Sequence, residues 1–176
     1  RAVTAPGRPA PDWNRLLPTL LDFERSPGRY PVRLREPRPL FDGVGSVMLL
    51  ASGRAVQGLP ATPWNEGELR RAARYFVRTV MLRPGADPFT LLGLTPDFEP
   101  AQLREHYRLM IRLTHPDFIA AGGHWPADAA TRVNRAKELL SSPQQRAHFA
   151  ATLRLPASRG AAVRTSAFLL EVLGGR

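Results

Sequence analysis

The stretch LREHYRLMIRLTHPD, residues 103–117, carries two side-chain patterns and then ends abruptly. Four side chains, three or four residues apart, predict one face of a helix over about 100–114: Leu103, Tyr107, Met110 and Thr114. Arginines at four-residue intervals predict a basic stripe on another face: Arg104, Arg108 and Arg112. Because proline lacks an N–H and restricts the residue before it, Pro116 should end this helix.

The tripeptide His115-Pro116-Asp117 holds an imidazole and a carboxylate within reach of each other. It could be an acid–base pair, a metal site, a plain turn or a surface that touches another protein. Acid–base chemistry needs a nucleophile and a third group, and the sequence shows no constellation for either. The chain has four scattered histidines without HExxH-like spacing and no cysteine, so we expect neither a metal nor another cofactor. The turn and the contact surface stay open.

Signals for further helices flank this stretch. Asp87 and Pro88 suit the cap and first turn of a short helix, Pro88 to Leu92, which Gly93 closes. After a loop, apolar spacing predicts a helix over about 127–141, and Ser142-Pro143 begins a last helix that runs to about Leu153. We expect a linker and a C-terminal helical tail over residues 156–176.

The N-terminal half is rich in proline, with 10 of the 18 prolines in residues 1–64. Residues 1–11 are typical of a disordered lead, and the segment 12–86 follows. Leucines after Trp13 have helical spacing, although Pro18 favours a short or kinked helix. The stretch from Arg29 to Gly53 allows a short β-hairpin, because its prolines disfavour a long helix. A capping-type pair, Asn65 and Glu68, predicts a strong helix over 66–82.

The composition points to acidic partners. The formal net charge is +10, and Lys137 is the single lysine among 25 basic residues. Residues 1–86 carry 14 basic and 7 acidic side chains, whereas residues 87–155 carry 8 and 7. The charge therefore lies mainly before residue 87, where a nucleic acid, an acidic protein or a membrane face are alternative partners. No stretch is long and apolar enough to cross a bilayer, and the lack of cysteine fits a reducing compartment, so we expect a cytoplasmic protein.

The order of elements from about Asp87 to Leu153 resembles the J domain of DnaJ-type co-chaperones. The resemblance rests on DPFTLLGL, LREHYRLMIRLTHPD and RVNRAKELLSSPQQRAHF as they stand here. It implies a mainly α fold, with a helical hairpin and flanking short helices at 87–155 after the N-terminal segment. It also implies that the chain is not an enzyme, but docks on a DnaK-type (heat-shock protein 70) ATPase and stimulates ATP hydrolysis. Residues matching the family's partner contacts are His115, Pro116, Asp117, Arg104, Tyr107, Arg108 and Arg112.

The sequence departs from the family pattern at several positions. Leu109 stands where the family usually has a second basic residue, Thr114 where an aromatic is common, and Lys137 where the third helix usually has an aromatic. Phe118 and Ile119 replace a charged continuation of the loop. There is no Gly/Phe-rich region, so residues 1–86 would choose the client or the location. The alternative is a J-like module that docks within a larger assembly without stimulating an ATPase.

Overall fold

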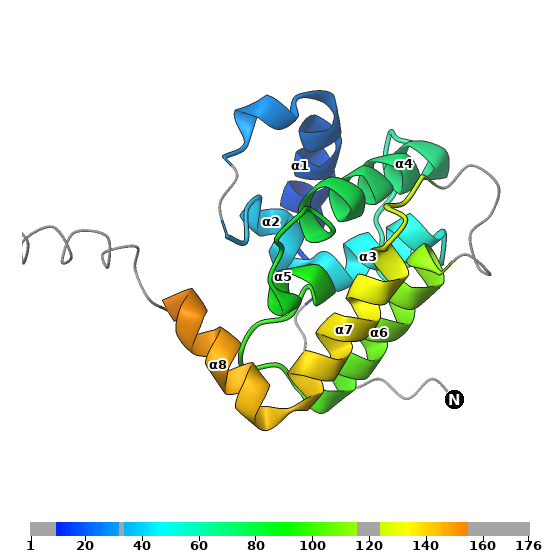
Figure 1. The fold of residues 1–176 in the computed structure, drawn as a ribbon. Coiled ribbons are helices and arrows are strands. Elements are labelled where there is room, and N and C mark those ends of the chain that lie inside the picture. The colour runs from blue at the N-terminus through cyan, green and yellow to red at the C-terminus, as the bar shows by residue number, and fades with distance from the viewer. Residues whose placement is uncertain (1–9, 32–33, 116–123, 155–176) are drawn as a thin grey trace, which may run out of the picture.

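The protein is helical wherever its structure is described. The computed structural model describes residues 10–31, 34–115 and 124–154, and within these ranges it contains helices and no strand (Figure 1). The expectation of a mainly α fold is therefore confirmed. The predicted lead before residue 10, the residues Pro116 and Asp117, and the predicted tail after residue 155 lie outside the described residues.

The segment that allowed a β-hairpin instead forms two helices, α2 (Arg38–Asp42) and α3 (Val44–Ser52). Pro39 lies in the first turn of α2, where a helix does not need the N–H that proline lacks. Most of α3 is apolar, and the helix is packed inside the molecule rather than half-exposed like an edge strand. Gly53 ends α3 with a positive φ of 71°, which favours glycine.

The first helix, α1 (Trp13–Arg25), is 13 residues long and contains Pro18. Pro18 therefore does not end the helix, and it lies on the exposed side. The opposite side is anchored by buried residues: Leu16, Leu17, Leu20, Leu21 and Phe23. Burial of this apolar face outweighs the hydrogen bond that proline removes. A short 3-10 turn, η1 (Pro27–Arg29), follows.

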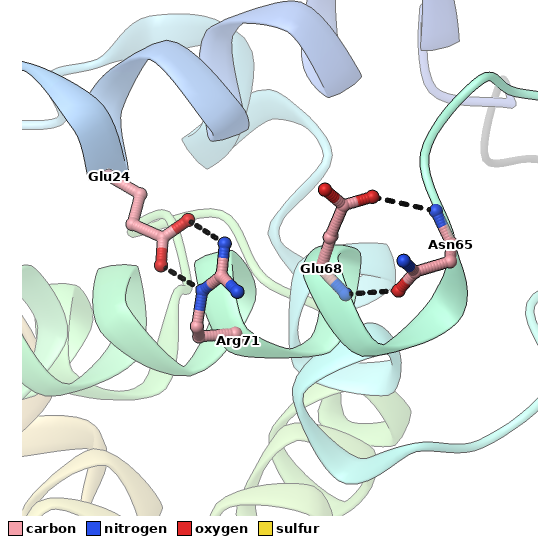
Figure 2. Close-up of polar contacts among 4 residues, drawn as sticks. All are labelled: Glu24, Asn65, Glu68 and Arg71. Atoms are coloured by element: carbon pink, nitrogen blue, oxygen red, sulfur yellow. Dashed lines mark hydrogen bonds and ion pairs between the residues drawn. The ribbon is translucent and has the colours of Figure 1, made fainter.

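The helix predicted at 66–82 is present as α4 (Glu66–Phe76) followed by a π-helical turn, η2 (Val77–Met81). Its capping pair forms as expected (Figure 2). The Glu68 main-chain N–H donates to the Asn65 side chain at 2.9 Å, and the Asn65 main-chain N–H donates to the Glu68 carboxylate at 2.9 Å. These two bonds satisfy donors that would otherwise lack partners at the start of α4.

Helix α4 lies against α1 through charged and aromatic contacts. Arg71 donates two hydrogen bonds to the Glu24 carboxylate, at 2.6 and 3.4 Å (Figure 2). Phe76 is fully buried, with its ring 6.0 Å from that of Phe23 and 5.5 Å from that of Phe41. Because Phe23 lies in α1 and Phe41 in α2, this cluster fixes the N-terminal helices to one another.

The second half begins with α5 (Pro88–Leu92), capped by Asp87, whose carboxylate accepts from the Thr90 N–H at 3.0 Å. The longest helix, α6 (Pro100–Thr114), pairs side by side with α7 (Ala129–Ser141) as a hairpin (Figure 1). The last described helix is α8 (Pro143–Arg154). The four helices predicted between residues 87 and 153 are thus all present, within about two residues of the expected bounds.

The two halves share one continuous hydrophobic core. Helix α3 packs against α6, and α5 packs against both α7 and η2. At Gly93, which follows α5 with φ 62°, an added Cβ would lie 2.8 Å from a Val44 methyl group of α3. The halves therefore touch too closely for a side chain at this position. The domain boundary near residue 86 stays a prediction. In the described ranges, none of the helices combines the length and apolarity needed to cross a membrane.

Candidate protein-docking site

The basic stripe predicted on α6 is exposed. Arg104, Arg108 and Arg112 all point to solvent, and no ion pair joins them to another residue of the described ranges. Each is one helical turn from the next, so the guanidinium groups follow one another at about 6 Å along the axis. Such a row is suited to carboxylates on another protein, because guanidinium donates paired hydrogen bonds to carboxylate oxygens.

His115 lies directly after this row and ends the helix. Its main-chain N–H donates to the Ile111 carbonyl at 2.8 Å, and its backbone is extended, with φ −73° and ψ 131°. This is the conformation that a following proline imposes. The side chain of His115 is half-buried. The described structure thus places His115 at the end of the arginine row, whereas its two predicted companions, Pro116 and Asp117, lie outside the described residues.

Tyr107 lies at the seam between α6 and α7 rather than in the arginine row. Its hydroxyl donates to the Asn134 side chain at 2.8 Å, and the Lys137 ammonium lies 4.8 Å from the ring centroid. Both partners belong to α7. Tyr107 is half-buried and packs on the core, so its clearest role in the described structure is to hold the hairpin together.

Residues 87–150 match the family model described as the DnaJ domain. This part of the chain is a DnaJ domain. No solved structure matches the chain. A DnaJ domain supports a function of the J-domain co-chaperone kind and suggests a heat-shock protein 70 partner. The match covers α5, α6, α7 and most of α8, so it leaves the N-terminal helices unassigned.

The position at which the DnaJ domain lacks its usual second basic residue is buried. Leu109 is only 4% exposed, and it shares one face of α6 with His106 and Leu113, at 1% and 5%. His106 faces α3, because a Cβ added at Gly45 would lie 3.5 Å from its Nε2 atom. The face of α6 that carries Leu109 is therefore directed toward the N-terminal helices. A lysine or arginine at position 109 would place a charged group in this buried contact, which explains why the residue there is apolar.

Two more of the departures, Thr114 and Lys137, also have structural counterparts in this DnaJ domain, whereas Phe118 and Ile119 lie outside the described residues. Thr114 is 3% exposed, and its hydroxyl donates to the Met110 carbonyl at 2.8 Å within α6. A buried hydroxyl is satisfied in this way without a partner from another helix. Lys137 replaces an aromatic but still covers Tyr107, through its cation over the ring.

One residue that joins the DnaJ domain to the N-terminal helices was missed by sequence reasoning. Arg132 of α7 donates to the carbonyl oxygens of Leu82 and Arg83 at 2.7 and 2.6 Å, just after the end of η2. These carbonyls lack helical partners, and a guanidinium group can bind both at once. An arginine at an unremarkable position of a helix gives no sequence signal for such a long-range contact.

The arginines of α4 and η2 do not form one row. Arg71 pairs with Glu24, Arg74 donates to the Ala51 carbonyl at 3.0 Å, and Arg78 lies over the Tyr75 ring. Burial, and then the nearby charge of Arg70, lower the pKa of Arg74. Each of these cations thus has its own neighbour, and the nucleic-acid alternative stays a hypothesis. In the part of the chain that the structure describes, no three His, Asp or Glu side chains are grouped as they would be around a metal ion.

Proposed function

We propose that the chain is a co-chaperone that docks on a DnaK-type (heat-shock protein 70) ATPase and stimulates its ATP hydrolysis. The observation that carries the proposal is the exposed row of Arg104, Arg108 and Arg112, which leads along α6 of a DnaJ domain to His115. An unpaired cationic row beside a half-buried histidine fits an acidic protein surface better than a small substrate.

The parts of this site would act in sequence. The arginine row attracts an acidic face of the chaperone and sets the register of the complex, since charged rims raise association rates more than affinity. The backbone of His115 is already extended, so this residue would need little further ordering when the partner binds. By the family resemblance, Pro116 and Asp117 complete the contact, and Asp117 would accept a charge-assisted hydrogen bond from a partner arginine.

In this proposal the chain itself is not an enzyme and holds no cofactor, because the ATP chemistry belongs to the chaperone. The N-terminal helices would select a client or a location. We place this work in the cytoplasm, which suits a chain without cysteine. The fixed contacts of α3 with α6 and of Arg132 with the end of η2 support a rigid link between the selecting part and the DnaJ domain.

A second candidate function is favoured by the burial of Leu109. The DnaJ domain has lost one basic group from α6, and the N-terminal helices cover that face. A module of this kind could dock within a larger assembly without stimulating an ATPase. The two functions differ in one observable, which is the rate of ATP hydrolysis by the chaperone.

The experiment is single-turnover ATP hydrolysis by a DnaK-type chaperone from the same cell, titrated with the wild-type chain and with Arg108→Gln. We expect stimulation by the wild type, and a half-maximal concentration about three- to tenfold higher for Arg108→Gln, as for the loss of one charged contact. Arg135→Gln on α7, also exposed, is the matched control and should match the wild type. Binding without stimulation would favour the docking module instead.

A further inference from the structure

A cavity of about 580 Å³ lies in the N-terminal helices, between the end of α3 and the start of α4. Its volume is in the range of ligand sites in proteins. Its walls combine apolar side chains, two arginines and two exposed glycines; the lining residues that matter are Leu50, Leu59, Leu69, Gly53, Arg54 and Arg70. The family match does not cover this region, and the contacts described for α6 do not use it.

The cationic side of the cavity is crowded. The Arg70 guanidinium lies against Gly53, where an added Cβ would be 2.9 Å from the Arg70 Cζ atom. The Nε atom of Arg70 is buried and has no hydrogen-bond partner. Arg74, one turn further along α4, is partly buried and donates to the last turn of α3. The carbonyl end of α3 therefore faces two neighbouring guanidinium groups.

Carboxylates in the cavity wall do not balance these cations. Glu66 is the acidic residue that lines the cavity, and it lies in the first turn of α4, where the N–H groups of the helix already favour a negative charge. Arg54, on the rim, is exposed and has no ion pair with another described residue. An incoming carboxylate would thus meet a net positive wall next to an apolar one.

We propose that this cavity binds a short apolar peptide segment that carries a carboxylate. Apolar side chains of the segment would lie against Leu50, Leu59 and Leu69, and the carboxylate would bind the guanidinium groups of Arg70 and Arg54. A peptide fits better than a fatty acid, because Gly67 lines the cavity in the first turn of α4, where a main-chain N–H has no acceptor within the helix and can donate to a peptide carbonyl. The cavity would be the site that selects a client or a location, and this role rests on the proposed function.

The test uses two fluorescent probes that bind the full-length chain in place of the peptide. The first is 8-anilinonaphthalene-1-sulfonate, an apolar anion, and the second is N-phenyl-1-naphthylamine, its analogue without the sulfonate. We expect Arg70→Met and Arg54→Gln each to weaken binding of the anion about tenfold and to leave the neutral probe within about twofold. Leu59→Ser should weaken both probes, and Arg15→Gln, exposed on α1, is the matched control that should change neither.

Competition then identifies the occupant. The peptide acetyl-LVELF-amide should displace the anionic probe at least about fivefold better than acetyl-LVQLF-amide. Equal displacement by the two peptides, or displacement by palmitate alone, would overturn the peptide assignment, and so would probe binding that none of the cavity variants alters. Because the assay contains no chaperone, a chain that binds the peptide but fails to stimulate ATP hydrolysis would refute the proposed function and leave the site standing.

Discussion

The burial of Leu109 leads to a prediction that runs against the family pattern: introducing the residue that DnaJ domains usually have there should destabilise this protein. Leu109→Lys removes a side chain that is 96% buried on the face of α6 directed at α3. Truncating a buried leucine costs about 2–5 kcal/mol. A lysine can lay its stem along the same surface and direct its ammonium to solvent, so we expect a loss of about 2–3 kcal/mol.

The assay is urea unfolding, followed by circular dichroism, of Leu109→Lys and of the adjacent control Arg108→Lys. Arg108 is exposed, so its replacement should change the free energy of unfolding by less than about 0.5 kcal/mol. In thermal unfolding, the loss at Leu109 corresponds to a fall in Tm of about 4–12 °C for a chain of this length. If the two variants were equally stable, the N-terminal helices would not cover α6, and the explanation of the missing basic residue would be wrong.

Two further predictions concern contacts that hold the helices together. Arg132→Met should lower the free energy of unfolding by about 1–3 kcal/mol in urea, because it removes the Arg132 donor from the Leu82 carbonyl and leaves the Arg83 carbonyl with the Ala86 N–H alone. Arg135→Met, exposed on the same helix, should not lower it. Tyr30 donates to Asp22 at 2.7 Å, and burial together with this bond raises the pKa of Tyr30 from 10.0 to about 12. The raised pKa means that its contribution to stability is complete below pH 10 and is lost as the pH rises toward 12. Unfolding measured across this interval should show the loss in the wild type and not in Tyr30→Phe; an identical pH dependence in both would contradict the assignment.

Local signals in the sequence were sufficient to predict where the helices of the DnaJ domain begin and end. Asp87 and Gly93 mark the two ends of α5, and proline at 116 places the end of α6 at His115, because capping and proline geometry act over a few residues. The exposed arginine row also followed from spacing alone. These features need no knowledge of what packs against them.

The contacts between the two halves could not be predicted in the same way. Pro18 predicted a short or kinked helix, and α1 continues past it because α4 covers the buried leucines of α1. In the sequence, Leu109 is only a departure from the basic residue that the family usually has. The packing of α3 on α6 explains why this position is apolar. The secondary structure of residues 29–53 was ambiguous from the sequence. Prolines precede the apolar residues of α3, and a short apolar run is equally compatible with a buried helix and a strand. Tertiary packing decided each of these cases.

We propose that this DnaJ domain stimulates a chaperone ATPase through the end of α6. The most direct measurement is the single-turnover rate of ATP hydrolysis by a DnaK-type chaperone with the wild-type chain, with His115→Gln and with His124→Gln, an exposed histidine close to the start of α7. We predict that the wild type and His124→Gln raise the rate equally and that His115→Gln leaves it at the level of the chaperone alone. A folded wild-type chain that leaves the rate unchanged, or a His115→Gln variant as active as the wild type, would contradict the claim.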